Sequence, residues 1–303
     1  MIKDVALVVN PAAGRGGARD VLRRAVDRLA ARGIAVRELC GASPAESRDL
    51  AGAAVRAGVD ALVVVGGDGM IHLALPAVVG TDTPLGVIPA GTGNDQARTY
   101  GWPRKSPESA ADIVADGYTR RVDVGVAVTA DGTRSYFGSV LASGFDSLVS
   151  DRTNRMRWPR GRARYNLAML AEFANLRPLP CTVTTAEGET IRQDVLLVAV
   201  GNTPSYGGGM RICPAADPTD GVFDVTIAGA VSRRRAAAQV PRVYRGTHVH
   251  RPQARTLRTT ALRIEAPGIN AYADGEYLGP LPVDVTLEPQ AVSLLVPRAS
   301  AGG

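Results

Sequence analysis

The chain has 303 residues, of which 45% are apolar and 21% charged. This length is enough for two ordinary domains, and the composition is typical of a folded protein and excludes a disordered one. No apolar run reaches the roughly 18 residues of a membrane span. A charge pair at Lys3 and Asp4 is unlike a secretory signal, so we expect a cytoplasmic protein. Three cysteines without a C-x-x-C pair argue against a disulfide framework or a cysteine zinc site.

Arginine supplies almost all of the positive charge. Only Lys3 and Lys105 are lysines among 35 basic residues, and the formal net charge is +6. Neither lysine lies in a glycine-rich loop, so a phosphate site of the Walker type is excluded. A net charge of this size is compatible with a polyanionic partner or a membrane surface and identifies neither.

The first 120 residues alternate between short apolar runs and segments of helical period. Helical spacing between Val21 and Leu29 predicts a helix that ends at Gly33. The stretch 43–46 (Ser-Pro-Ala-Glu) forms a capping box and predicts the start of a second helix, which ends near Gly58. Strands separated by helices predict an α/β domain with an open, mostly parallel sheet over residues 1–122. The segments that predict strands are 5–9, 34–39, 61–65 and 85–88, and the short apolar run 5–9 predicts a buried one.

From about residue 122 the pattern becomes mostly β. Turn residues separate many alternating segments, and only 165–176 and 234–244 have the period of helices. We therefore expect a mostly-β sandwich domain over residues 123–303. The predicted strands are 122–128, 133–143, 181–186, 194–200, 222–228, 256–265, 284–287 and 292–296.

Three glycine-rich loops follow strands of the first domain, at 10–17, 66–69 and 89–98. Because the carboxyl ends of parallel strands meet at one edge of a sheet, three such loops indicate one phosphate site built from loop amides and helix N-termini. Asp68 lies among three glycines, and a carboxylate there suits magnesium, which takes one or two carboxylates with water and phosphate oxygens. Taken singly, each loop is also compatible with a plain turn or with a helix cap, here Asn94 or Asp95.

Three further segments carry weaker signals. The stretch 274–276 (Asp-Gly-Glu) lies between two strand-like runs and predicts a hairpin turn. Segment 152–164 holds six arginines and no acid, with Met156 and Trp158 among them, which is typical of a face that meets anionic lipid and equally of a solvated arginine cluster. The His-Val-His stretch 248–250 lacks a third metal ligand, so we expect surface histidines. No nucleic-acid-binding signature accompanies the charge, so we expect no nucleic-acid partner.

Taken in order, these segments make the sequence resemble the diacylglycerol kinase catalytic-domain family, and most closely its actinobacterial members. The resemblance covers nearly the whole chain. The glycine–aspartate loop alone also occurs in NAD kinases and phosphofructokinase relatives, whereas the ordered set is more specific. The motifs are Asn10-Pro11-x-x-Gly14, Gly66-Gly67-Asp68-Gly69, Pro89-x-Gly91-Thr92-x-Asn94-Asp95-x-Ala97-Arg98, Gly144-Phe145-Asp146, Asp220-Gly221-x-Phe223-Asp224 and Asp274-Gly275-Glu276.

The resemblance implies an ATP-dependent kinase that phosphorylates the free hydroxyl of diacylglycerol to give phosphatidic acid, with Mg²⁺ as cofactor. It implies that Asp68 and Asp95 organise Mg²⁺ and its waters, and that Asp274 is the base that takes the proton from the lipid hydroxyl. It also implies a homodimer. Together with segment 152–164, it leads us to expect a cytoplasmic enzyme in peripheral contact with anionic membrane. A second, structural Mg²⁺ is implied at Asp217, Asp220 and the Val222 carbonyl, and nucleotide contacts are implied for Asn10, Pro11, Gly14, Arg15, Gly16, Gly66, Gly67, Asp68, Gly69, Met70, Gly91, Thr92 and Asn94.

The sequence departs from the family pattern at Met70, where a threonine is usual, and at His72-Leu73, where an Asn-Glu pair is usual. These changes leave the preference for ATP over GTP open. Three alternatives also stay open: a kinase of another lipid such as a sphingoid base or glycolipid, an NAD kinase, and a nucleotide- or lipid-binding regulator without activity. The segments 91–98 and 274–276 argue against an NAD kinase, and the intact aspartates argue against a regulator.

Overall fold

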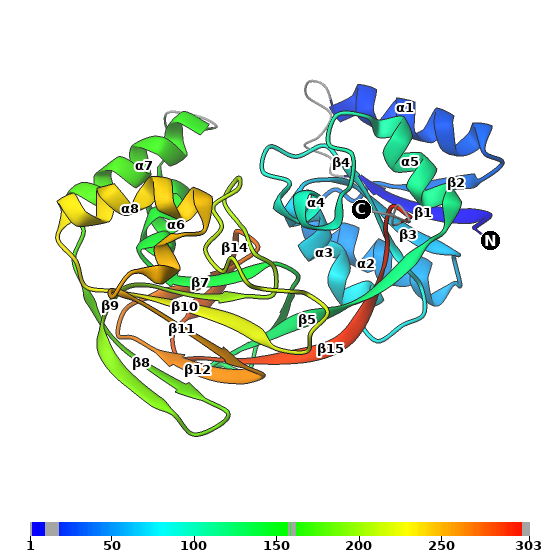
Figure 1. The fold of residues 1–303 in the computed structure, drawn as a ribbon. Coiled ribbons are helices and arrows are strands. Elements are labelled where there is room, and N and C mark those ends of the chain that lie inside the picture. The colour runs from blue at the N-terminus through cyan, green and yellow to red at the C-terminus, as the bar shows by residue number, and fades with distance from the viewer. Residues whose placement is uncertain (1, 10–17, 157, 159–161, 299–303) are drawn as a thin grey trace. The chain divides into compact units, whose positions relative to one another are not determined.

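The protein is described from a computed structural model (Figure 1), which describes residues 2–9, 18–156, 158 and 162–298. It divides into two compact units: unit 1 comprises Met1–Val124 and Glu288–Gly303, and unit 2 comprises Gly125–Leu287. The predicted domain boundary near residue 122 lies close to this division. The predicted second domain also contained residues 288–303, which the structure assigns to unit 1.

Unit 1 is built on a parallel sheet with helices on both faces (Figure 1). Helices α1 and α5 pack against each other on one face, and α2 and α3 do so on the other. The strands, in spatial order, are β2 (Ala35–Leu39), β1 (Asp4–Val9), β3 (Ala61–Gly66) and β4 (Leu85–Pro89), followed by the end of β15 (Val283–Leu295). The helices are α1 (Ala18–Ala31), α2 (Pro44–Arg56), α3 (Asp68–Val78), α4 (Asp95–Tyr100) and α5 (Pro107–Asp116).

The four predicted strands and the helix cap at Ser43 form as predicted, although β2, at the edge of the sheet, is largely exposed. Residues 61–65 of β3 are completely buried, as a central parallel strand requires. Ser43 Oγ accepts a hydrogen bond from Glu46 N at 3.2 Å, and Glu46 Oε2 accepts one from Ala42 N at 2.6 Å. The first bond satisfies an amide in the first turn of α2 that the helix itself leaves unpaired. The second is donated by the residue before the cap, so the predicted capping box is replaced by a bond one residue earlier.

Helix α5 was not predicted. Its cap is nevertheless visible in the sequence, because Ser106 Oγ accepts a hydrogen bond from Ser109 N and Pro107 occupies the first turn. Arginines on α1 pair with acids on α5, for example Arg28 Nε with Asp112 Oδ1 at 2.8 Å. Part of the arginine content is therefore structural.

Unit 2 is a sandwich-like arrangement of antiparallel strands, and helices α6, α7 and α8 lie on the same face of its sheet (Figure 1). Strand β9 joins the two layers, since it pairs with β8 along its first half and with β7 and β10 along its second. The strands are β5 (Thr119–Thr129, shared with unit 1), β6 (Arg134–Phe137), β7 (Val140–Gly144), β8 (Leu179–Thr185), β9 (Thr190–Gly201), β10 (Phe223–Gly229), β11 (Ala254–Thr259), β12 (Ala261–Glu265), β13 (Asn270–Ala273), β14 (Glu276–Pro280) and the first part of β15. The helices are α6 (Phe145–Arg155), α7 (Arg162–Ala174), α8 (Arg233–Arg245) and the 3₁₀ turn η2 (His248–His250).

Several predicted strand limits differ from the structure. The predicted strand 133–143 is two strands, β6 and β7, and 256–265 is also two, β11 and β12. The predicted strands 284–287 and 292–296 are parts of one long strand, β15. Helix α6 was not predicted. Within the described residues, no helix combines the length and apolar character needed to cross a membrane.

Residues 288–298 are fixed to unit 1 by a buried hydrogen bond. Trp102 is 3% exposed, and its Nε1 donates to Leu295 O at 2.7 Å.

Trp102→Phe removes the donor of this hydrogen bond, so we expect the free energy of unfolding to fall by about 1 to 3 kcal/mol. Urea unfolding measures this. Trp158→Phe, at a side chain that is 80% exposed, is the control and should change little; equal losses in the two variants would contradict the assignment.

Candidate functional site

The loops after β3 and β4 are in backbone contact. A Cβ added at Gly91 would lie 2.5 Å from the Cα of Gly67 and 2.7 Å from Oδ1 of Asn94. A Cβ at Gly67 would in turn lie 3.1 Å from the Cα of Gly91. Since backbone cannot yield as a flexible side chain can, glycine is required at Gly91. The structure therefore brings two of the three predicted glycine loops together.

Asp68 stabilises the contact between the two loops through hydrogen bonds. Its Oδ2 accepts a hydrogen bond from Asp95 N at 3.1 Å, and its Oδ1 accepts one from Gln96 N at 3.0 Å. Asp68 therefore caps α4 from another loop, in place of the predicted local cap by Asn94 or Asp95. The Asn94 side chain instead closes on Gly91, accepting from its N at 3.1 Å and donating to its O at 2.7 Å.

Two carboxylates face the same spot beside Gly93. A Cβ at Gly93 would lie 3.2 Å from Asp68 Oδ2 and 3.6 Å from Asp95 Oδ2. Asp95 is 3% exposed, and its Oδ1 accepts from Arg98 Nη1 at 2.8 Å. This donor set fits Mg²⁺, which needs only one or two carboxylates when phosphates and water complete its shell. The described residues include no group of three or more His, Cys, Asp or Glu side chains arranged around one point, so nucleotide and water would have to supply the rest.

The other predicted nucleotide residues differ in placement. Thr92 is exposed in the loop after β4. Met70 is 6% exposed, and its Cγ would lie 2.4 Å from a Cβ at Gly66, so its side chain packs inside the unit. Gly69 lies in the first turn of α3, where helix amides without partners are available to an anion. The predicted contacts at Asn10, Pro11, Gly14, Arg15 and Gly16 lie outside the described residues.

Asp274 is at the turn between β13 and β14, as the predicted hairpin requires. Its φ is 53° and that of Gly275 is 88°, the pair of positive angles typical of a two-residue hairpin turn. Asp274 Oδ2 accepts from Gly138 N at 2.8 Å, and Oδ1 accepts from Ser139 N at 2.8 Å and from Ser139 Oγ at 2.5 Å. These donors fix the orientation of the carboxylate.

Ser139 and Asn202 support Asp274 and were missed by the sequence analysis. Asn202 Nδ2 donates to Gly138 O at 3.0 Å, and Asn202 N donates to Ser139 O at 2.8 Å. These contacts hold the segment before β7 in place beneath the Asp274 carboxylate. No local sequence signal could have found them, because the partners are more than sixty residues apart.

The carboxylates predicted for a second metal already have partners. Asp217 Oδ1 accepts from Thr219 N and Oγ1, and Asp220 Oδ1 accepts from Val222 N at 3.2 Å. The guanidinium of Arg258 donates to Asp220 Oδ2. A cationic side chain therefore stands beside this loop, and a metal at Asp217, Asp220 and Val222 stays a prediction.

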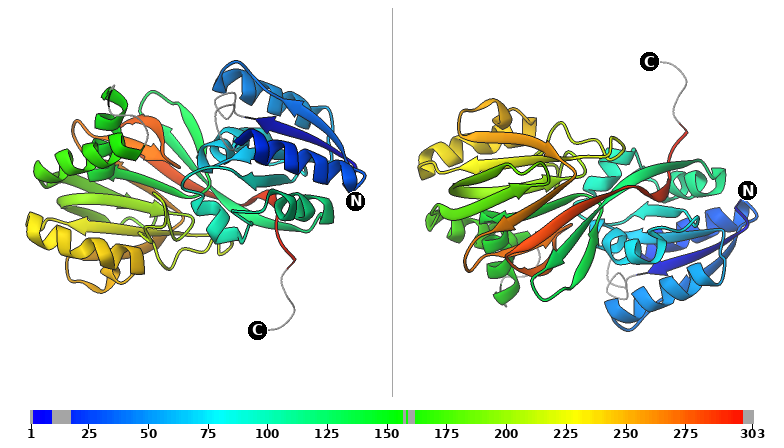
Figure 2. Two further views of the ribbon diagram at one scale, coloured as in Figure 1. Left: turned by 90° about the horizontal axis from the view of Figure 1, so that it is seen from above. Right: turned by 90° about the horizontal axis from the view of Figure 1, so that it is seen from below.

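Unit 2 contains a largely apolar cavity of about 390 Å³. Its walls come from the start of α6, one side of α7, one side of α8, and strands β9 and β10; the left view of Figure 2 shows sheet strands between α7 and α8. Tyr206 and Met210, from the loop after β9, also line it. The sequence pointed to this cavity only in part. The motif at 144–146 supplies Phe145 and Asp146 of its wall, and the segment 204–209, which could line an acceptor cleft or form a flexible loop, supplies Tyr206. The other lining residues are scattered from 169 to 254.

Three polar atoms of the cavity wall are buried without a hydrogen-bond partner among the described residues: Asp146 Oδ2, Gln239 Oε1 and His248 Nδ1. Burial raises the pKa of Asp146 to about 7. His248 is 6% exposed and its Nε2 lies 3.1 Å from Ile212 O, so the prediction of a surface histidine is wrong at this position. Burial lowers the pKa of His248, which favours the neutral ring.

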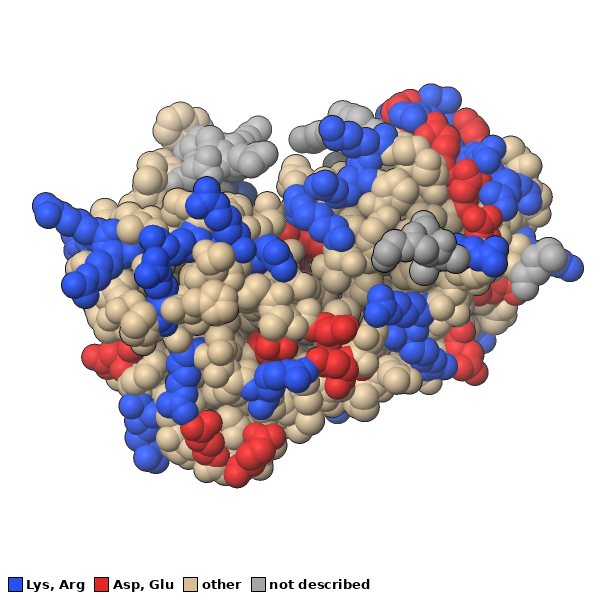
Figure 3. Space-filling model, in the orientation of Figure 1, with Lys and Arg blue, Asp and Glu red and all other residues tan. Residues whose placement is uncertain are grey.

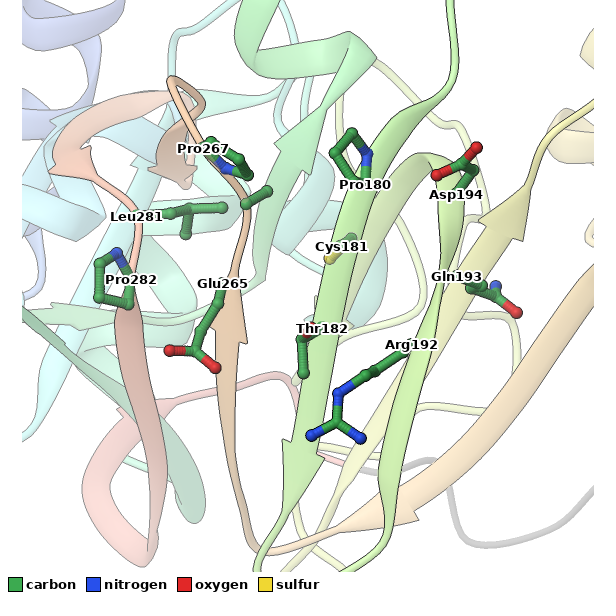
Figure 4. A pocket seen from close by; sticks show the side chains of 11 residues that line it. Pro180, Cys181, Thr182, Arg192, Gln193, Asp194, Glu265, Pro267, Leu281 and Pro282 are labelled. Carbon is green, nitrogen blue, oxygen red and sulfur yellow. The ribbon is translucent and has the colours of Figure 1, made fainter.

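A second pocket in unit 2, of about 560 Å³, contains none of the predicted site residues (Figure 4). Residues of β8, β9 and β12, with Leu281 and Pro282, line it. Burial raises the pKa of the Cys181 thiol there to about 11, so this thiol is protonated and unreactive.

Residues 4–127 match the diacylglycerol kinase catalytic domain, and residues 139–296 match the YegS C-terminal NAD kinase beta sandwich-like domain. A diacylglycerol kinase of Mycobacterium tuberculosis (strain ATCC 25618 / H37Rv) is 47% identical over 297 residues, which are 98% of this chain and 96% of that protein. The chain belongs to the diacylglycerol kinase family.

More distant members of the diacylglycerol kinase family match over the same extent. A diacylglycerol kinase of Bacillus subtilis (strain 168) is 25% identical over 99% of this chain and 98% of its own length. A crystal structure of a putative diacylglycerol kinase from Bacillus anthracis superposes with a TM-score of 0.80 at 24% identity, covering 98% and 96% of the two chains. The fold predicted from the sequence, an α/β domain followed by a β-sandwich-like domain, is confirmed.

The contact between Gly67 and Gly91 makes a prediction about the nucleotide loops. Gly91→Ala places a methyl group against backbone, so we expect it to separate the two loops, weaken ATP binding at least tenfold and lower the free energy of unfolding by about 1 to 3 kcal/mol. Titration calorimetry and urea unfolding measure the two effects. Gly52→Ala is the matched control, because the added Cβ there meets only the flexible end of Arg56 at 3.1 Å. Unchanged ATP affinity in Gly91→Ala would contradict the role of the contact.

The raised pKa of Asp146 makes a prediction about pH. The folded protein keeps a proton that the unfolded chain, with a carboxyl pKa near 3.8, has released. The contribution of Asp146 to the free energy of unfolding should therefore fall as the pH rises from about 4 to about 7. Asp146→Asn cannot ionise and lacks this fall, so it should be the more stable protein at pH 8, by about 4 kcal/mol.

Urea unfolding at several pH values measures this difference. Asp49→Asn, at an exposed carboxylate on α2, is the matched control and should follow the wild-type pH dependence. If Asp146→Asn also followed it, Asp146 would titrate as an ordinary carboxylate.

Proposed function

We propose that the protein is an ATP- and Mg²⁺-dependent diacylglycerol kinase that produces phosphatidic acid. The observation that carries the lipid acceptor is the apolar cavity of unit 2, whose volume and lining suit a hydrocarbon chain. The diacylglycerol itself is taken from the names of the relatives. An NAD kinase needs no apolar cavity of this kind, so the cavity favours the lipid over the dinucleotide.

The described residues support a division of roles. In unit 1, loop amides near Gly67 and Gly91 and the first turn of α3 would contact ATP phosphates, and Asp68 and Asp95 would hold Mg²⁺, which neutralises phosphate charge. In unit 2, Asp274 would accept the proton of the lipid hydroxyl. The hydroxyl oxygen then bonds to the γ-phosphorus while the bond from that phosphorus to the β,γ-bridging oxygen breaks, which releases ADP.

The proposal includes a cytoplasmic enzyme that reaches its lipid at the membrane, and a homodimer. Segment 152–164 supports membrane contact in part. Trp158 is 80% exposed, as an interfacial anchor would be. Arg152, however, pairs with Glu172 at 2.5 Å, and Arg164 Nη1 donates to Met156 O at 3.1 Å, so these two arginines have roles within unit 2.

Transfer of labelled phosphate from ATP to a lipid panel tests the proposal. The panel contains a diacylglycerol, a sphingoid base and a glycolipid, each in uncharged detergent micelles. NAD, which is water-soluble, is added as a fourth acceptor in the same buffer. We expect transfer to the diacylglycerol, with turnover lowered about 10²-fold or more in Asp274→Asn while ATP still binds. Ser139→Ala, which removes one of three donors and keeps the carboxylate, should lose much less.

Three outcomes decide between the candidates. Transfer to another member of the panel would replace diacylglycerol as acceptor. ATP binding without transfer to any member would favour a regulator. Turnover near the wild-type value in Asp274→Asn would remove Asp274 from the role of base.

A further inference from the structure

Helix α8 carries an exposed arginine cluster that the sequence analysis did not single out. Between Asp224 and Glu265 the chain has nine arginines and no acid. Four exposed arginines belong to α8, and among the described residues no ion pair joins them to an acid. Figure 3 shows basic side chains gathered over this part of unit 2. We call the side chains of Arg233, Arg234, Arg235 and Arg245 the α8 face.

The position of three of these arginines is unfavourable for the helix itself, whereas Arg245 lies in the last turn, where a cation is favourable. Arg233, Arg234 and Arg235 form the first turn of α8, which has no acidic residue, and Ser232 makes no side-chain cap bond there. The N-terminal end of a helix carries partial positive charge, so three cations at this end repel it. An anion outside the protein would relieve that repulsion. The arrangement is therefore better explained by an external polyanion than by stability of the fold.

The same helix borders the opening of the apolar cavity. On α8 the cavity is lined by a stripe of apolar residues at helical spacing, Ala236, Val240 and Val243. The four arginines lie outside this stripe and do not line the cavity. Val240 is nevertheless 49% exposed, and Leu170 on α7, which also lines the cavity, is 66% exposed. Two cavity residues on facing helices are thus open to solvent, so the cavity has its mouth between α7 and α8. Tyr244, on the next turn of α8, is 50% exposed and adds an aromatic edge.

We propose that the α8 face docks on the headgroups of an anionic bilayer and holds the cavity mouth against the lipid. Clustered arginines attract anionic headgroups, and apolar and aromatic side chains beside them enter the interface. The positive charge of the α8 face is complementary to the phosphate of anionic lipids. The exposed apolar residues at the cavity mouth, Leu170 and Val240, favour a bilayer over a nucleic acid, because a nucleic acid has no hydrocarbon chains to contact them. This inference rests on the proposed lipid acceptor and adds the surface through which that acceptor arrives.

Vesicle sedimentation with the full chain tests the proposal. The α8 variant changes Arg233, Arg234, Arg235 and Arg245 to glutamine. The matched control changes Arg48, Arg56, Arg104 and Arg192, which are also exposed, and so removes the same charge elsewhere. Vesicles of phosphatidylcholine with phosphatidylglycerol should bind wild type and control similarly and the α8 variant about tenfold more weakly or worse. Vesicles of phosphatidylcholine alone should not separate the three proteins.

Phosphorylation of diacylglycerol in uncharged micelles separates this inference from the proposed function. The α8 variant should retain wild-type turnover there and lose it on the anionic vesicles. If wild type transfers phosphate to no lipid in micelles, the proposed function fails. The comparison of vesicle binding between the α8 variant and the control still tests the α8 face in that case. Equal vesicle binding by the α8 variant and the control would overturn the inference. Loss of polyuridylate binding in the α8 variant with vesicle binding unchanged would also overturn it, in favour of RNA.

Discussion

The loops at the carboxyl edge of the unit 1 sheet depend on the carboxylate of Asp68. It follows a buried parallel strand, and its two oxygens accept hydrogen bonds from the first two backbone amides of α4. This joins the loop after β3 to the loop after β4, at the place where Gly67 and Gly91 leave room for backbone contact. Without that join, the Asp95 carboxylate would not face the spot beside Gly93 that Asp68 also faces. One side chain thus sets both the shape of the loops and the pairing of the two acids.

Unit 2 depends on a different constraint. The Asp274 carboxylate is oriented by Gly138 and Ser139, which are themselves held by Asn202. A hairpin turn and the beginning of β7 are thereby fixed to the end of β9. On another part of unit 2, helices α7 and α8 leave a largely apolar cavity above strands β9 and β10 instead of packing it closed. An oriented acid and an unfilled apolar space are the features that a lipid-hydroxyl kinase requires.

Local signals in the sequence predicted part of this structure. Continuous apolar runs predicted β1, β3 and β4 because parallel strands are buried on both faces, and the stretch 43–46 predicted the start of α2. Helix α5 was missed because its apolar stripe is narrow, at Ala110, Ala111 and Val114, although its cap was present. Helix α6 follows Gly144 directly from a strand, so no loop marks its start. The return of 288–298 to unit 1 depends on distant partners such as Trp102 and Leu85.

The site was predicted unevenly for the same reason. Motifs indicated Asp68, Asp95 and Asp274, whereas Ser139 and most of the cavity come together only when distant segments meet. The arginines of the α8 face are close in the sequence, and only their place beside the cavity mouth needed the structure. The claim that Asp68 and Asp95 together hold Mg²⁺ is tested most directly by the magnesium dependence of ATP binding. Titration calorimetry measures it for wild type and for Asp68→Asn over a range of Mg²⁺ concentrations. The account predicts that Mg²⁺ strengthens ATP binding to wild type and has little effect on ATP binding to the variant. The same Mg²⁺ titration in both proteins would contradict it.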